Sequence, residues 1–300
     1  MDETWGDEPS VLIFSNQEHH RAAALAAAES VGARVIGTEP IDNALERLHR
    51  LVAVDSVMIE LDESGGAHLE WLLDWANHAA RNGTAGAVIS MPKALIDRVT
   101  ARIDDPNVQL LCDPEVEERV AGLGFVLAER RHRLHDQGVE ADAERLRRLS
   151  EEVARIAGAL AELSTSAKSV AYAAPRDISP VDGGARVDAE TVRNVIRLRR
   201  LREQFFAKDL FADPAWDMLL DLLAARLEQS RVAVSSLCIA AAVPATTALR
   251  WIRTLTEHGL FVRRHDPEDG RRIFIELSDG ATDALTAYLQ TAHQMGFKTP

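Results

Sequence analysis

The sequence is poor in cysteine and has no long apolar run. Its two cysteines, Cys112 and Cys238, lie in apolar stretches of different predicted domains, which indicates buried thiols rather than a disulfide or a metal site. No stretch approaches the roughly 18 apolar residues of a membrane helix. The acidic first residues, MDETWGDE, lack the basic region of a secretory signal. We therefore expect a cytoplasmic protein that has no membrane partner and binds no metal.

Motifs for catalysis are also missing. The sequence has no nucleophile elbow, no glycine loop that cradles a phosphate and no metal-ligand spacing. We predict that the protein is not an enzyme and needs no cofactor. One alternative stays open: Asp62, Glu63 and Asp113 form an acidic patch near predicted strand ends, where paired carboxylates can act as acid and base. The first part of the chain would then be a remnant enzyme or a small-molecule sensor.

The charge is distributed unevenly along the chain. The 300 residues carry a net charge of −13 and are 46% apolar, which is normal for a globular chain of two domains. Residues 1–120 hold 22 acidic against 9 basic side chains, whereas residues 121–300 hold 25 of each. Phosphate should repel the first part, so only local arginine clusters in the second part can bind a polyanion.

The first part of the chain alternates short apolar runs with helical patterns. This alternation is typical of an α/β unit with a doubly wound parallel sheet, in which helices cross over between strands. Ligand sites of such folds lie at the carboxyl ends of the strands. The five predicted strands are residues 11–15, 33–38, 56–61, 85–90 and 107–112.

The length and order of these strands resemble the receiver domains of response regulators. The resemblance implies a flavodoxin-like fold, but the receiver motifs are absent. Ser15 and Asn16 stand where receivers hold magnesium with acidic residues, Glu60 stands at the phosphoacceptor position, and Asp113 replaces the lysine that precedes a proline. A phosphoryl site needs positive charge, and this one has lost it. We predict that the domain is not phosphorylated; Glu60 is either a scaffold carboxylate or an imitation of a phosphorylated aspartate.

A heptad pattern follows the first domain. Six apolar residues from Leu146 to Leu163 alternate in spacings of three and four, flanked by charged side chains. This pattern predicts a coiled coil that pairs two chains, although an amphipathic helix packed on its own protein stays open. The proline, aspartate and glycine content of residues 175–184 indicates a linker. We therefore expect a homodimer.

The last third of the chain carries the strongest functional pattern. Residues 232–241 and 244–261 read as two short helices around a tight turn that contains Pro244. Two strands follow, at 260–265 and 271–277, joined by the turn residues of DPEDGRR. A helix of this size fits the major groove of DNA, and arginines on an adjacent ribbon can reach phosphates or a narrow minor groove. Double-stranded DNA is the predicted partner.

This layout resembles the winged helix-turn-helix of MarR-type transcription regulators, on the basis of the turn Asp269-Gly270-Arg271-Arg272 and the preceding helix pair. The resemblance implies a dimer whose recognition helices enter successive major grooves. Bases would be read by Thr246, Thr247 and Arg250, and Arg271 would enter the minor groove. Phosphates would be held by Arg253, Arg264 and Arg272.

The sequence thus predicts four segments and a homodimeric transcription regulator. A protein-interaction scaffold, which would use the winged helix and the coiled coil without DNA, is the alternative. The sequence identifies neither a small-molecule effector nor an operator. The predicted segments are a receiver-like domain at 1–135, a coiled-coil helix at 136–170, a linker at 171–187 and a winged-helix domain at 188–300.

Overall fold

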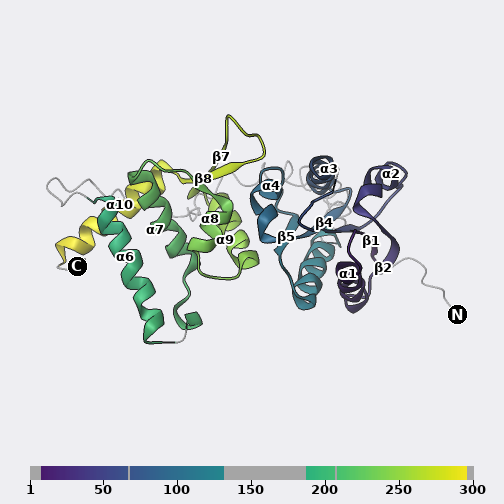
Figure 1. Cartoon of the computed structure of the whole chain (residues 1–300), viewed down its shortest axis with the longest axis horizontal. Helices are drawn as coiled ribbons and strands as arrows, with labels where there is room; N and C mark the ends of the chain where they lie inside the picture. Colours follow the sequence, from purple (N-terminus) through teal and green to yellow (C-terminus); the bar gives the residue numbers. More distant parts are fainter. Residues whose placement is uncertain (1–7, 67, 132–186, 207, 296–300) are drawn as a thin grey trace, which may run out of the picture.

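The computed structural model describes residues 8–66, 68–131, 187–206 and 208–295. These residues form an N-terminal region (8–131) and a C-terminal region (187–295), which follow one another along the longest axis of the molecule (Figure 1). The predicted coiled coil lies outside the described residues, as does the predicted linker except for Val187.

A five-stranded parallel sheet forms the centre of the N-terminal region. The strand order is β2-β1-β3-β4-β5, so β5 is an edge strand. This is the flavodoxin-like order, and it confirms the predicted α/β fold. Each strand lies within one residue of its predicted bounds. The apolar runs of β1, β3, β4 and β5 are buried almost throughout, as expected of strands covered on both faces, whereas the edge strand β2 is partly exposed. The strands are β1 (Ser10–Ser15), β2 (Arg34–Glu39), β3 (Ser56–Glu60), β4 (Gly86–Met91) and β5 (Val108–Cys112).

Helices cover both faces of this sheet. Side chains alternate along a strand, so Val11 and Ile13 of β1 pack on one face with α1 (Glu18–Ser30) and with the helical residues 116–131. The other face, which includes Leu12, is covered by the remaining helices. These are η1 (Ile41–Asn43), α2 (Ala44–His49), α3 (Leu69–Arg81), η2 (Lys93–Leu95) and α4 (Ile96–Thr100).

The C-terminal region combines helices with a small antiparallel sheet of order β6-β8-β7. The ribbon of β7 and β8 projects from the body of this region (Figure 1). The elements are α6 (Ala189–Leu201), η3 (Arg202–Gln204), η4 (Lys208–Phe211), α7 (Pro214–Leu227), β6 (Val232–Ala233), α8 (Val234–Ala240), α9 (Ala245–Glu257), β7 (Phe261–His265), β8 (Ile273–Leu277) and α10 (Asp279–Gln294).

One expectation for this region was wrong. Residues 232–241 were expected to be a single helix, but Val232 and Ala233 form the short strand β6. They pair with Ile275 and Phe274 of β8, and α8 starts only at Val234. Two residues are too few to produce a period that distinguishes a strand from the first turn of a helix.

Local sequence sets the ends of the helices. The side chains of Asp188, Asp213 and Ser278 each accept a hydrogen bond from the backbone N–H three residues on, which caps α6, α7 and α10. Gly259 follows α9 with φ of 70°, in the left-handed conformation that glycine adopts without strain.

The two regions share one apolar core. A continuous cluster of buried side chains includes Leu110 and Cys112 of β5 together with Cys238 of α8 and Leu249 of α9. In Figure 1, α8 and α9 face α4 and β5. Within the described part of the chain no single helix has the length and apolar character to cross a bilayer, although α8 and α9, bent by 108°, pass such a test as a pair.

Candidate nucleic-acid interface

The helix pair α8 and α9 forms the first half of the candidate interface. The two helices meet at 108°, and Ala242 in the turn between them adopts a φ of 52°. Ala248, Ile252 and Leu255 of α9 are buried, as their spacing predicts. The opposite side of α9 carries the polar residues Thr247 and Arg250, of which Thr247 is half-buried and Arg250 is exposed.

The ribbon of β7 and β8 forms the second half. Its tip is closed by hydrogen bonds within the turn: the backbone N–H of Asp266 donates to the carbonyl of Arg272 (3.1 Å), and that of Arg272 donates to the carbonyl of Asp269 (3.0 Å). The Asp269 carboxylate also accepts from the backbone N–H of Arg271 at 3.0 Å. This turn holds the side chains of Arg271 and Arg272 at the tip, where each is about two-thirds exposed.

Comparison with known proteins agrees with this geometry. Residues 217–281 match the family described as "Winged helix DNA-binding domain". This part of the chain is a winged helix. It contains the helix pair and the ribbon just described, in which α9 corresponds to the recognition helix and the β7–β8 ribbon to the wing.

Several solved structures resemble about a third of the chain. The DNA complex of MepR from S. aureus shares 20% identity over 36% of this chain and 84% of that chain, with a TM-score of 0.26. A probable transcriptional regulator from Pseudomonas aeruginosa shares 25% identity over 35% of this chain and 79% of that chain, with a TM-score of 0.25. BpsR from Bordetella bronchiseptica shares 19% identity over 35% and 79%, with a TM-score of 0.22. No curated protein matches the sequence.

Four of the seven predicted DNA contacts lie on accessible surface of the winged helix. Arg250 is exposed on α9. Arg264 lies 3.4 Å from Glu276 across the ribbon, and Arg272 lies 3.6 Å from Asp269 within the turn. Arg271 reaches the N-terminal region, with its Nε 3.6 Å from a carboxylate oxygen of Glu70 in α3. Such exposed ion pairs are weak, so these guanidiniums remain available to a stronger anion.

Thr246 and Arg253 are placed differently, because both contact the edge strand β5. Thr246 is 6% exposed; its hydroxyl accepts a hydrogen bond from the backbone N–H of Cys112 at 2.9 Å and lies 3.4 Å from the Cys112 carbonyl. Arg253 donates to the carbonyls of Pro106 (2.8 Å) and Val108 (2.6 Å). Burial lowers the pKa of Arg253 from its ordinary value. In this conformation neither side chain is free to meet DNA.

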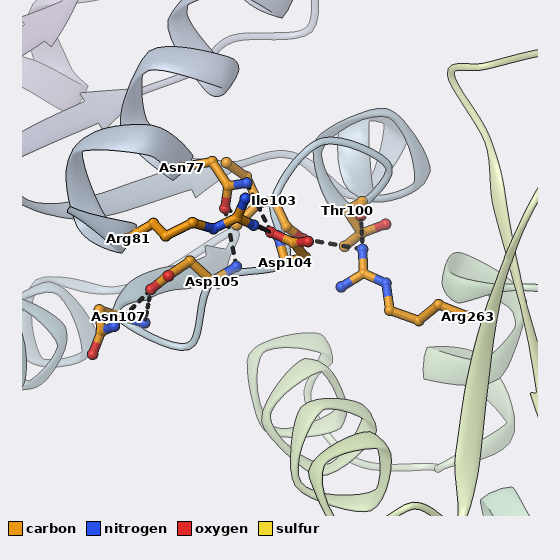
Figure 2. Close-up of polar contacts among 8 residues, drawn as sticks. All are labelled: Asn77, Arg81, Thr100, Ile103, Asp104, Asp105, Asn107 and Arg263. Atoms are coloured by element: carbon orange, nitrogen blue, oxygen red, sulfur yellow. Dashed lines mark hydrogen bonds and ion pairs between the residues drawn. The ribbon is translucent and has the colours of Figure 1, made fainter.

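Arg263 of β7 makes a third contact between the two regions, which the sequence did not predict. Its Nη2 donates to the carbonyl of Ile103 at 3.0 Å and also to that of Thr100. Figure 2 shows the guanidinium reaching from the ribbon to the chain that follows α4. Burial lowers the pKa of Arg263, and the nearby Asp104 carboxylate opposes this shift.

Asp104 and Asp105 stabilise the loop that receives Arg263. The Asp104 carboxylate accepts hydrogen bonds from Asn77 (2.8 Å) and Arg81 (2.7 Å) of α3. The side chain of Asn77 in turn accepts from the backbone N–H of both Asp104 and Asp105. The Ile103 carbonyl, which accepts from Arg263, therefore directly precedes residues that are hydrogen-bonded to α3 (Figure 2).

A fourth contact joins α4 to α8. The Asp97 carboxylate accepts hydrogen bonds from the backbone N–H (2.8 Å) and the hydroxyl (2.5 Å) of Ser235. Ser235 lies in the first turn of α8, where a carboxylate bonds an N–H that has no partner within the helix.

At the carboxyl ends of the strands, where a ligand site was expected, the negative charge of Glu60 is balanced by Arg119. Glu60 is 1% exposed and is bonded by Nη2 of Arg119 at 2.8 Å, by Nε of Arg119 at 3.1 Å and by the Ser90 hydroxyl at 2.8 Å. Arg119 also donates to the Pro114 carbonyl. The charge of Glu60 is therefore matched by an internal cation at the border of a cavity of about 460 Å³, which Glu60 and Arg119 both line.

The acidic patch borders the same cavity. Asp62, Glu63 and Asp113 all line it. A hydrogen bond from the Ser64 hydroxyl lowers the pKa of Asp62, which keeps this carboxylate ionised. In the described residues no group of three or more histidine, cysteine, aspartate or glutamate side chains is arranged to hold a metal ion.

The two cysteines lie on either side of the contact between the regions. Both are free and buried, as predicted. Burial raises the pKa of Cys112 to about 11 and that of Cys238 to about 12. Thiols with such values stay protonated and unreactive at neutral pH.

Proposed function

We propose that the protein is a transcription regulator that binds double-stranded DNA through its winged helix. The match of residues 217–281 to winged-helix DNA-binding domains carries this proposal. The arrangement of α9 beside an arginine-tipped ribbon supports it, since a helix can enter the major groove while the ribbon follows the backbone or the minor groove. No catalytic role is proposed.

Each arginine has a separate part in this proposal. Arg250 and Thr247, on the accessible side of α9, read base edges. Arg271 at the ribbon tip enters a minor groove, and Arg264 and Arg272 hold phosphates. Thr246 and Arg253 join them only when α9 leaves β5.

We further propose that the regulator is a homodimer, as its resemblance to MarR-type proteins implies. Supporting this, large apolar side chains are exposed at and after the end of α6 and at and after the end of α10, where a second copy can cover them. Its large apolar side chains, between 42% and 73% exposed, are Leu198, Leu201, Phe205, Phe206, Tyr288 and Met295. Sedimentation velocity tests the dimer: wild type should sediment as a dimer and the double variant Phe205→Asp/Phe206→Asp as a monomer. If wild type also sediments as a monomer, the proposed homodimer is refuted.

A receiver-like role without phosphorylation is proposed for the N-terminal region. Its strand order supports this role, and the Glu60–Arg119 pair supports the absence of phosphorylation, because the position that would accept a phosphoryl group is already bonded to an internal cation. The region then acts through the contacts it makes rather than through chemistry at its own cavity.

A scaffold that binds protein instead of DNA is the second candidate. One observation favours it: α9 already packs against a protein surface. Selection of bound sequences from a pool of random duplexes by the purified full chain separates the two functions. Enrichment of a shared motif supports the regulator; recovery of no duplex above background, at any ionic strength, supports the scaffold.

A further inference from the structure

The N-terminal region covers the surface with which the winged helix would bind DNA. Every contact described between the regions uses an element of the winged helix: Ser235 on α8, Thr246 and Arg253 on α9, Arg263 on β7 and Arg271 in the ribbon turn. Three of these five residues, Thr246, Arg253 and Arg271, belong to the predicted DNA contacts. The covered surface and the predicted DNA-binding surface therefore overlap.

The physical basis of the contact is an open sheet edge. Because β5 is the last strand of its sheet, the N–H and C=O groups on its outer side have no strand to pair with. Thr246 bonds the N–H of Cys112, and Arg253 bonds the carbonyl of Val108. Side chains of helix α9 thus provide hydrogen-bond partners for backbone groups of β5 that no neighbouring strand pairs with.

The strand β5 and a DNA major groove cannot both contact α9 at the same time. One side of the helix is fixed in its own core through Ala248 and Leu255. The major groove is about 12 Å wide and an α-helix with its side chains is about 10–12 Å across, so a bound helix has no room for a second partner on its outer side. With β5 against α9, the groove cannot receive the helix.

The contact between the two regions is also of a kind that a polyanion such as DNA can displace. Arg253 and Arg263 donate to neutral backbone carbonyls, which are weaker acceptors than phosphate. A pocket of about 290 Å³ remains between the regions, bordered by Leu110, Leu249 and Arg250, so the packing there is incomplete. Residues 1–120 carry a net charge of −13, so that DNA repels the covering region.

We propose that the N-terminal region is an intramolecular inhibitor, which holds α9 and the ribbon in a closed form and must separate from them before DNA binds. This inference rests on the proposed DNA-binding function. It assigns the Asp97–Ser235 contact a regulatory role, because Asp97 holds the first turn of α8 without belonging to the predicted DNA contacts. The apparent dissociation constant then equals the intrinsic value divided by the open fraction.

Asp97→Ala in the full chain tests the proposal. It removes two hydrogen bonds from the closed form, so the open fraction rises, and we expect DNA to bind about tenfold more tightly. Asp74→Ala is the matched control: it removes the same charge from the N-terminal region, but among the described residues Asp74 forms an ion pair with Arg102 alone, within that region. The control should shift affinity by less than about twofold.

The outcomes separate the two proposals. Tighter binding by Asp97→Ala but not by Asp74→Ala supports the inhibitor. Equal affinity of wild type and both variants overturns the inhibitor and leaves DNA binding intact. If none of the three proteins binds DNA at very low ionic strength, the regulator function itself fails, and the inhibitor fails with it.

A measurement on the wild-type chain guards against a variant that does not fold. The amide of Cys112 is bonded by Thr246 only in the closed form, so its hydrogen exchange should accelerate when a bound duplex is added. The amide of Val57, in the central strand β3, serves as the internal control and should not change. Unchanged exchange at Cys112 in the DNA complex would overturn the proposal.

Discussion

The hydroxyl of Thr246 accepts a hydrogen bond from the backbone N–H of Cys112 across 134 positions of sequence. The first residue belongs to the recognition helix of the winged helix and the second ends the edge strand of the parallel sheet. A residue predicted to read bases is thus a structural part of a protein contact. This relationship links the fold of the N-terminal region to the proposed control of DNA binding.

Substitution of Arg250 tests base reading. Arg250→Ala should weaken binding to the preferred duplex by about 1–3 kcal/mol and should relax sequence preference, because a guanidinium that bonds a base edge is lost. Competition between the preferred and a scrambled duplex measures both effects. Arg50→Ala, in an exposed pair with Glu46 on the N-terminal region, is the control and should change neither. An equal loss on both duplexes would contradict the role given to Arg250.

Removal of Arg119 tests the buried ion pair. Arg119→Ala leaves the carboxylate of Glu60 buried without its cation, and the free energy of unfolding should fall by about 3–5 kcal/mol in urea titrations. The double variant Glu60→Leu/Arg119→Met removes both charges and should recover much of that loss. If the single variant is as stable as wild type, the pair is not the structural element described above.

A phosphodonor tests whether the N-terminal region has retained receiver chemistry. Incubation with acetyl phosphate and magnesium should leave the intact mass unchanged, because Glu60 is bonded to Arg119 and Ser90 and a phosphoryl site needs uncompensated positive charge. An aspartate-containing receiver domain treated in parallel confirms that the reagent is active. A stable adduct on the N-terminal region would refute this reading.

Acid should weaken the protein partly through Glu70. A hydrogen bond from Arg98 lowers the pKa of Glu70 below its ordinary value of 4.5, and Arg271 of the ribbon adds to the shift. A lowered folded pKa means that this stabilisation is fully present above pH 4.5 and is lost as the pH falls through the folded pKa. The free energy of unfolding, measured by urea titration between about pH 3 and 6, should depend less steeply on pH for Glu70→Gln than for wild type. Equal slopes for the two proteins would contradict this assignment.

Local patterns predicted most of the fold. Each of the five strands is an apolar run whose neighbours end it, and the positions of Pro244 and Gly259 mark the limits of α9. The short strand β6 was missed because its two residues acquire their conformation from pairing with β8.

The partners within the site could not be predicted in the same way. Arg119 lies 59 residues from Glu60, and only the folded sheet brings them together. Arg253 has the spacing of a residue on the outer side of α9, but the sequence does not show that this side lies against β5. The packing of one region on another depends on surface shape, which leaves no periodic signal in the sequence.

The salt dependence of duplex binding tests the central claim most directly. For the full chain, the logarithm of the association constant should fall steeply and linearly with the logarithm of salt concentration, because several arginines displace counterions from phosphate. Arg272→Ala should reduce the slope by about 1, as expected for one lost phosphate contact. A chain that binds no duplex even at very low ionic strength, or binds with a slope near zero, would contradict the account.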